Sequence, residues 1–215
     1  VPDLVPPRGV KAELLMLLES PHLDELRNGI PLSGSAGRAA SRFLFPACRT
    51  STALGEFIKG RHARNDFRVA IVNVSPVPLQ EKAFERSVSS PNLSGNDWAI
   101  LSAIQQSNKR AVTDLPGSIE QDTNRLLLPG LRSRLAEIEL TNSATLFLAG
   151  TFAERTWKDL GASSHSAHRS IPHPSWNGWE KATKSTYKTP AAERRRQVHA
   201  RNLQELRVIF SASIS

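Results

Sequence analysis

Continuous apolar runs, each followed by a polar loop, constrain the fold of this chain most strongly. The runs at residues 13–20 (ELLMLLES), 68–74 (RVAIVNV) and 145–149 (TLFLA) have the pattern of strands that are buried on both faces of a parallel sheet. A fourth, shorter strand is expected at residues 168–171, just before Pro172.

Helix-forming stretches and loops separate these runs. Residues 1–11 and 75–95 are rich in proline, and we expect an irregular lead-in and a loop there. Strands that alternate with helices predict an α/β fold, a three-layer α/β/α sandwich around a central, mostly parallel four-stranded sheet. Because no internal repeat or long linker divides the chain, residues 1–215 are expected to form a single domain. The expected helices span residues 36–45, 50–59, 97–112, 118–139 (interrupted at Pro129-Gly130), 151–160 and 190–210.

The composition excludes several classes of protein. A chain of 215 residues can bury enough surface for a core without cross-links. Its single cysteine, Cys48, which we expect in the core, excludes an intrachain disulfide framework and any cysteine-built zinc or iron–sulfur site. The sequence has no run of 18 apolar residues and no secretory h-region. We therefore expect a reduced, cytoplasmic protein without membrane segment, metal or cofactor.

Positive charge is in excess and unevenly distributed. The chain has 28 Lys and Arg against 20 Asp and Glu, a net charge of +8 and a sequence pI near 10.2. Residues 180–210 alone contain eight basic and three acidic residues, and the basic ones include Arg194, Arg195 and Arg196. Such a stretch is either a solvated helix face or the contact surface for a polyanion. Binding of Lys and Arg to a polyanion is favourable because it releases the counterions of the polyanion. Charge alone leaves both interpretations open.

The polar loops that follow the predicted strands are where we expect the chemistry. In an open parallel sheet, functional loops lie beyond the carboxyl ends of the strands. This rule brings together residues 19–37, 73–80, 150–151 and 172–179.

Two of these loops and one strand end carry sequence patterns in a recognisable order. Residues 17–37 read LLESPHLDELRNGIPLSGSAG, residues 171–179 read IPHPSWNGW, and Asn73 lies at a strand end between them. Together they resemble the uracil-DNA glycosylase superfamily, whose iron–sulfur branches have the first-loop pattern G-E-A-P-G-x-x-E-x-x-x-G-x-P-F-x-G-x-A-G. The matching first-loop positions are Glu19, Pro21, Glu25, Gly29, Pro31, Gly34, Ala36 and Gly37.

The resemblance implies a monofunctional DNA glycosylase that hydrolyses the N-glycosidic bond of an extruded base and leaves an abasic site. Breaking this bond develops positive charge on the sugar and negative charge on the departing base. We assign His173, of the His-Pro-Ser triplet, to the departing base. Glu19 or Glu25 would stabilise the sugar or orient a water, and Asp24 is the next candidate.

Base recognition is assigned to Asn73, Pro21 and Leu32. The side-chain amide of Asn73 offers both a donor and an acceptor to a base edge. Leu32 stands where the family has the aromatic residue that stacks on the base, and Leu18 and His22 replace two motif glycines. The cluster-binding cysteines are also absent, so we expect a cluster-free member. Loss of the stacking ring favours a larger or differently modified base over ordinary uracil.

Three segments are expected to contact the DNA backbone or base stack. Amides of the Gly-Ser-Ala-Gly turn would hold a phosphate at the start of the following helix. Trp176, beside an Asn-Gly turn, would present an apolar wedge to the base stack. The expected DNA contacts are Ser33, Gly34, Ser35, Gly37, Ser175, Trp176, Arg194, Arg195 and Arg196.

Two other functions fit the same residues. One is a DNA-binding module that kept the fold and the basic surface but does not excise bases. The other is a small-molecule hydrolase on a similar sheet, against which the basic C-terminal stretch argues, because a small substrate needs no extended basic face. We expect a monomer with DNA as its partner, and the removal of unusual bases from foreign DNA, such as modified phage genomes, is a role that would suit it.

Overall fold

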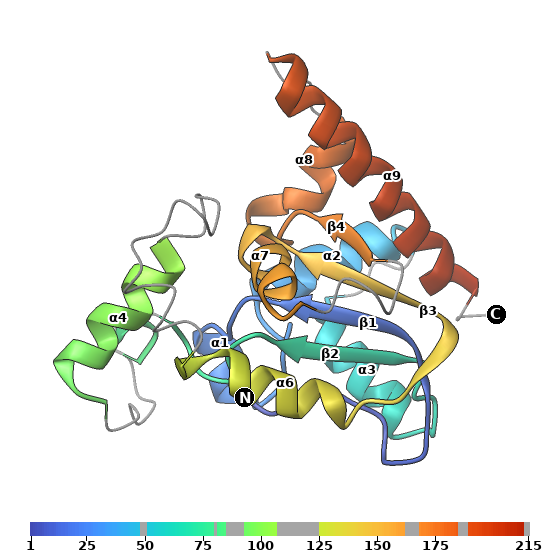
Figure 1. The fold of residues 1–215 in the computed structure, drawn as a ribbon. Helices are drawn as coiled ribbons and strands as arrows, with labels where there is room; N and C mark the ends of the chain where they lie inside the picture. Colours follow the sequence, from blue (N-terminus) through green and yellow to red (C-terminus); the bar gives the residue numbers. More distant parts are fainter. Residues whose placement is uncertain are drawn as a thin grey trace.

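A sheet of four strands forms the centre of the protein (Figure 1). The computed structural model describes residues 1–47, 51–79, 81–84, 93–106, 125–161, 168–184 and 189–212. The strands are β1 (Ala12–Leu18), β2 (Val69–Asn73), β3 (Leu140–Ala149) and β4 (His168–Ile171).

Every strand pair in this sheet is parallel, and the strand order is β2-β1-β3-β4. Since β1 is central, it is buried on both faces, as its apolar sequence predicts. The register places Leu18, the last residue of β1, opposite Asn73, the last residue of β2. The polar segments that follow these two strands therefore start side by side.

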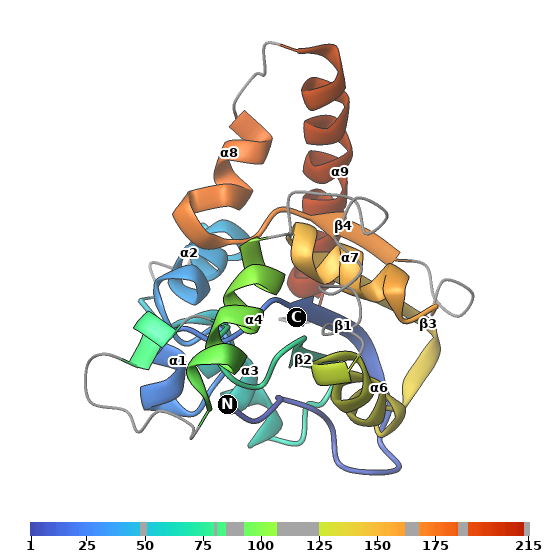
Figure 2. The ribbon, with the colours of Figure 1, turned by 60° about the vertical axis from the view of Figure 1, so that its left-hand side comes forward.

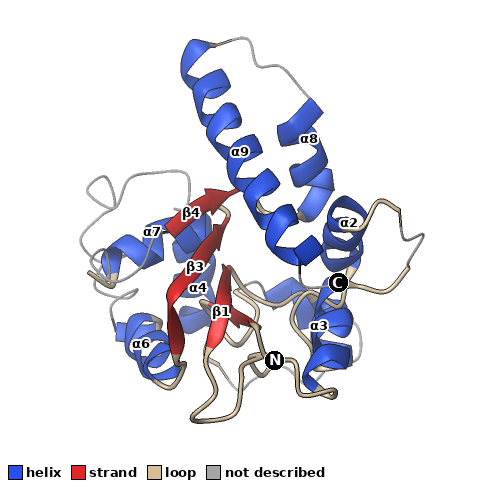
Figure 3. Cartoon of the chain, turned by 90° about the vertical axis from the view of Figure 1, so that its right-hand side faces the viewer, coloured by secondary structure: helices blue, strands red, loops and turns tan. Residues whose placement is uncertain are grey.

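Helices cover both faces of the sheet, so the expected three-layer sandwich is confirmed (Figure 3). Alternate residues of β1 point into two separate apolar cores, Met16 into one and Leu17 into the other. The core that contains Met16 includes residues of α2 (Ser35–Leu44), α3 (Leu54–His62), α8 (Gly178–Lys184) and α9 (Pro190–Ala212). The core that contains Leu17 includes residues of η1 (Glu81–Phe84), α4 (Gly95–Gln106), α6 (Leu128–Ala136) and α7 (Thr151–Asp159).

The sequence misses parts of the local structure. β3 begins at Leu140 rather than at residue 145, because its polar first half pairs with β1 through the backbone and needs no apolar side chains. Two short helices, α1 (Leu23–Asn28) and α8, lie where we expected only loops. α1 ends at Gly29, whose φ of 62° is left-handed and suits glycine. Cys48 and residues 107–124 lie outside the described residues.

The lead-in at residues 1–11 is not wholly irregular. Leu4 forms an antiparallel bridge with Ile71 through two backbone hydrogen bonds of 3.0 and 2.7 Å. This bridge covers part of the outer edge of β2, which pairs on its other side with β1. It also brings Asp3 to the end of β2, where the candidate site begins.

Candidate active site

The segments that follow the strands gather at one edge of the sheet, and Figure 2 brings forward the side of the molecule on which α1, α2, α4 and α7 surround it. The backbone amide of Ser75, beyond β2, donates to the carbonyl of Glu19, beyond β1, at 3.1 Å. The amide of Gly150, beyond β3, donates to the carbonyl of Ile171 at the end of β4, at 2.8 Å. The expected meeting of these loops is therefore observed.

Asn73 is almost inaccessible, with 1% of its surface exposed. Its side chain lies on the same face of the sheet as Val69 and Ile71, which alternate with it along β2. Neither its amide nitrogen nor its amide oxygen has a hydrogen-bond partner within the described ranges. A buried amide in this state costs free energy, so it is typical of a functional position rather than a packing position.

Two residues that the sequence did not single out fix the backbone of Asn73. The guanidinium of Arg134 donates to the carbonyls of Asn73 at 2.8 Å and Val74 at 2.7 Å, and it pairs with Asp3 at 2.8 Å. Asp3 in turn accepts the amide N–H of Asn73 at 3.3 Å. Arg134 and Asp3 thus bind the backbone of the strand end, and neither uses the side-chain amide of Asn73. No local signal marks these residues, because they lie 70 and 61 positions from Asn73.

Glu19 lies half-buried beyond the end of β1, as expected. Gln105 of α4 donates to its Oε1 at 2.9 Å. The buried guanidinium of Arg155 on α7 interacts with Glu19 electrostatically, and burial lowers the pKa of that guanidinium. A carboxylate with one oxygen oriented by an amide and with a cation nearby is suited to stabilising positive charge or orienting a water.

Glu25 has a different environment from Glu19. It is buried in α1, where its Oε2 accepts the amide N–H of His22 at 2.7 Å and its Oε1 accepts that of Leu32. Burial raises the pKa of this carboxyl, and the two amide hydrogen bonds oppose that rise. Because both carboxylate oxygens bind the loop's own backbone, the geometry indicates that Glu25 positions the loop.

Leu32 is turned into the core rather than toward a ligand. Only 2% of its surface is exposed, and it packs in the core that also contains Leu18 and Ala36. Its φ of 53° is unusual for a residue other than glycine. Gly37 makes this conformation possible, because a Cβ there would lie 1.7 Å from the carbonyl oxygen of Leu32. In this conformation Leu32 does not provide the base contact assigned to it, and Pro21 is also buried.

His173 is held rigidly between two glycines. A Cβ on Gly178 would lie 2.2 Å from the carbonyl oxygen of His173, and one on Gly150 would lie 3.3 Å from its Cβ. The amide of Ser175 donates to Nδ1 of His173 at 3.3 Å, so the neutral ring carries its proton on Nε2. Burial, followed by the proximity of His22, lowers the pKa of His173 to about 4. His173 is therefore a neutral hydrogen-bond donor at pH 7.

A cleft of about 450 Å³ separates the loop after β1 from the loop after β4. The rings of His22 and His173 meet edge to face across these loops, with centroids 6.4 Å apart. The cleft is large enough for a small-molecule ligand or one nucleotide-sized group. Its lining includes His22, Glu25, Ser35, Arg42, Ser175 and Trp176.

The start of α2 opens into the same cleft, but the predicted phosphate contacts there are only partly available. Ser35 is exposed, and Gly34 is the residue that precedes the first turn of α2. Ser33 is 1% exposed and donates its hydroxyl to the carbonyl of Ile30 at 2.8 Å. Gly37 is buried against Leu32. Ser33 and Gly37 therefore have packing roles, and the predicted phosphate contact is reduced to the amides that begin the helix.

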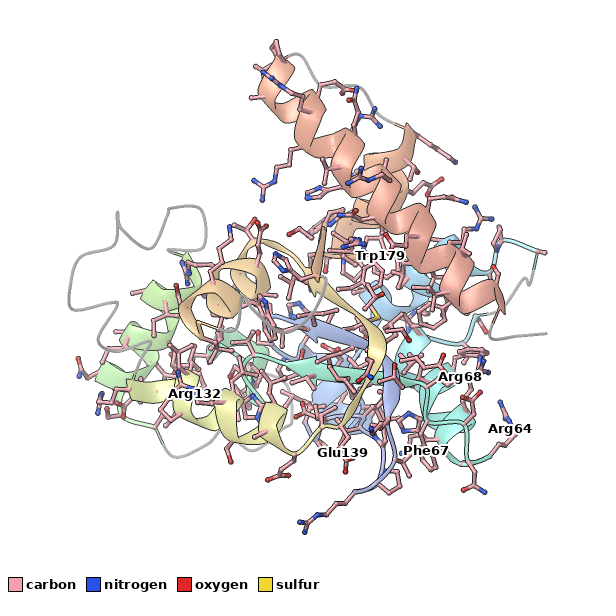
Figure 4. All side chains as sticks on the ribbon, turned by 45° about the vertical axis from the view of Figure 1, so that its right-hand side comes forward. Arg64, Phe67, Arg68, Arg132, Glu139 and Trp179 are labelled. Atoms are coloured by element: carbon pink, nitrogen blue, oxygen red, sulfur yellow. The ribbon has the colours of Figure 1, made fainter. Side chains whose placement is uncertain are left out.

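Trp176 and Trp179 lie three residues apart in opposite environments. Trp179 is buried, and its indole N–H donates to the carbonyl of Pro172 at 2.7 Å. Figure 4 shows Trp179 close to α9. Trp176 is 89% exposed and has a φ of 57°, which costs a residue with a Cβ about 1–3 kcal/mol. An exposed indole held at such a cost is typical of a contact surface.

The three arginines of the predicted DNA contact on α9 are not equivalent. Arg194 is exposed, and Arg195 pairs with Glu154 of α7 at 3.5 Å. Arg196 pairs with Glu193 at 2.6 Å and donates to the carbonyl of Ala182 at 2.9 Å. Arg196 therefore joins α9 to α8, and its assignment to DNA binding stays a prediction.

Comparisons with known proteins do not assign this site to a family. No protein-family model matches the chain, and no curated protein matches it significantly.

In the part of the chain that the structure describes, no helix is both long and apolar enough to cross a membrane. The same residues include no group of three His, Cys, Asp or Glu side chains placed to hold a metal ion.

Proposed function

We propose that this protein is a DNA glycosylase that hydrolyses the N-glycosidic bond of a modified base. The observation that supports this most strongly is the buried amide of Asn73, whose donor and acceptor have no partner among the described residues. A heterocyclic base edge presents complementary acceptors and donors side by side. An extruded base would thus satisfy both atoms of Asn73 at once.

His173 would assist the departure of the base. As the bond between C1′ and the base nitrogen breaks, the base takes both electrons, and negative charge develops on its carbonyl oxygen. The Nε2–H of the neutral His173 ring can donate to that oxygen, because Nδ1 is already occupied by the amide of Ser175. A neutral imidazole fits this role, because its N–H group stabilises the anion and the ring does not have to be protonated first.

Glu19 would act on the sugar. Loss of the base leaves positive charge at C1′, which a nearby carboxylate stabilises. Glu19 can also orient a water that adds to C1′ and can accept its proton. The proton that Glu19 accepts from the water then passes to the base anion. The products are the neutral free base and an abasic sugar, and Glu19 is again a carboxylate, so atoms and charge balance. Glu25 supports the same loop through the amides of His22 and Leu32.

The burial of Leu32 bears on the identity of the base. Without an aromatic ring at this position, and with the Leu32 side chain in the core, little stacking is available to a small pyrimidine. The cleft of about 450 Å³ is lined by His22 and Glu25 of the same loop rather than by Asn73, so it would offer room for a substituent beside the base. Both observations favour a bulky modified base as substrate.

The experiment is a panel of labelled oligonucleotides that each carry one modified base. Each is incubated with the protein and then heated in alkali, which cleaves the strand at abasic sites. We expect cleavage for at least one bulky modified base and a much slower reaction with Glu19→Gln. A folded parent protein that binds the oligonucleotides but yields no product from any base would refute excision and favour the non-excising DNA-binding alternative.

A further inference from the structure

A second hollow adjoins the cleft at the candidate site. It measures about 340 Å³ and lies among α2, η4 (Ser175–Asn177), α8 and α9. The two hollows share Ala39, Arg42 and Asn177, so they lie side by side along α2, and we refer to the two together as the groove along α2. In Figures 1 and 2, α8 and α9 project together from the body of the protein. Neither Arg42 nor the residues of this second hollow were among the DNA contacts expected from the sequence.

The charge of the second hollow is positive. Among the described residues, its cations are Arg42, Lys184 and Arg207, and its one acid is Glu180. Lys184 pairs with Glu180 at 2.6 Å, which neutralises both. Arg207 lies over the ring of Phe43, 6.0 Å from its centroid. Arg42 is exposed and, within the described residues, makes no hydrogen bond or ion pair. Arg42 and Arg207 thus leave an excess of positive charge beside the cleft.

The position of Arg42 links this charge to the exposed indole of Trp176. Both residues line the first hollow, and Arg42 and the neighbour of Trp176, Asn177, also line the second. Proteins that bind a single nucleic acid strand combine a cationic groove for the phosphates with exposed aromatic rings on which bases stack. The groove along α2 has both components.

We propose that this groove binds the single DNA strand that continues from the extruded nucleotide. The neighbouring base stacks on Trp176, the phosphate next to it binds Arg42, and the strand passes between α2 and α8 toward Arg207. This inference rests on the proposed function for its choice of DNA as the ligand. It adds Arg42 and Arg207 to the DNA contacts expected from the sequence.

The test is the binding of a fluorescein-labelled single-stranded 20-nucleotide oligothymidine, measured by fluorescence anisotropy over a range of salt concentrations. Arg42→Gln should weaken binding and reduce the slope of log K against log salt by about 0.7, the value for one phosphate contact on a single strand. The matched control is Arg64→Gln, because Arg64 is exposed and lies at the far side of the molecule from Trp179 in Figure 4. Both variants lower the net charge by one, so only a local contact separates them.

A second variant tests the proposal by a gain of affinity, which loss of folding cannot mimic. Glu180→Gln removes the one acid that the described residues contribute to the second hollow, and it releases Lys184 from its ion pair. This variant should therefore bind more tightly, with a steeper salt dependence. Glu137→Gln, at the exposed end of α6, is the control with the same change in net charge and should have a much smaller effect.

The outcomes separate this proposal from the proposed function. If Arg42→Gln and Glu180→Gln each match their controls while the parent protein binds and excises, the groove is not the strand path and excision stands. If the variants differ from their controls as expected but no base is excised, the groove binds DNA in a protein that does not excise. If the parent protein does not bind the oligonucleotide, the groove proposal is overturned.

Discussion

Replacing Asn73 with leucine should stabilise the folded protein and abolish excision. Leucine has the same branched skeleton of four heavy side-chain atoms as asparagine, although its methyl groups are larger, and it removes a buried amide for which the described residues provide no hydrogen bond. Burying such a group without a partner costs about 1–3 kcal/mol, so the free energy of unfolding should rise by about that amount. A functional residue whose removal increases stability is expected where a site is kept ready for a ligand.

Urea denaturation measures this change. With a slope near 2 kcal/mol per molar urea, a gain of 2 kcal/mol would raise the midpoint by about 1 M. Asn202→Leu is the control, because Asn202 is also buried, with 3% of its surface exposed, but its Nδ2 donates to the carbonyl of Ser170 at 2.9 Å, while its Oδ1 has no partner among the described residues. Losing the Nδ2 bond leaves the carbonyl of Ser170 without its donor, whereas losing the Oδ1 removes an unsatisfied acceptor. Asn202→Leu should therefore be less stable than Asn73→Leu.

Two results would refute the reasoning about Asn73. Destabilisation of Asn73→Leu to the same degree as Asn202→Leu would show that the Asn73 amide is satisfied in the folded protein. A stabilised Asn73→Leu that excises at the rate of the parent would show that the amide does not recognise the base.

Three further predictions concern the residues around this amide. His173→Gln should lower the single-turnover excision rate about a hundredfold. Because the folded-state pKa of His173 is about 4 and its ordinary value is 6.5, the unfolded chain binds more protons between these values. The parent should therefore lose up to about 3 kcal/mol of stability as the pH falls from 6.5 to 4, and His173→Gln should lose correspondingly less in urea titrations across this range. Glu25→Gln should lower the free energy of unfolding by about 1–3 kcal/mol, because one of the two backbone N–H groups that Glu25 accepts would face an NH₂ group. Glu19→Gln should mainly slow excision. If instead Glu19→Gln destabilises the fold and Glu25→Gln only slows excision, the roles of the two residues are exchanged. Trp176→Gly should leave the thermal midpoint equal or higher, because glycine adopts a positive φ without strain. The same variant should reduce excision from duplex DNA more than excision from single-stranded DNA. An equal reduction on both substrates would refute the role of Trp176 as a wedge.

The sequence determined the architecture because burial in a parallel sheet leaves a local mark. A strand covered on both faces, such as β1 or β2, has apolar residues at nearly every position, and its short length and flanking turn residues distinguish it from a buried helix. The rule that loops after parallel strands share one edge then placed Glu19, Asn73 and His173 at the same end of the sheet. These inferences need only neighbouring residues and chain topology.

Only the tertiary structure decided what each polar or aromatic side chain in those loops does. Glu19 and Glu25 are alike in sequence, but one meets Gln105 of α4 and the other binds the amides of its own loop. Trp176 and Trp179 differ in the same way, as do Arg194 and Arg196. Their partners come from distant parts of the chain or depend on a single φ angle, and neither leaves a periodic signal. The hydrophobic effect is non-directional and roughly proportional to the buried area, so the apolar residues along the chain predict which segments are buried. A hydrogen bond instead depends on which atoms the finished fold brings within about 3 Å of one another.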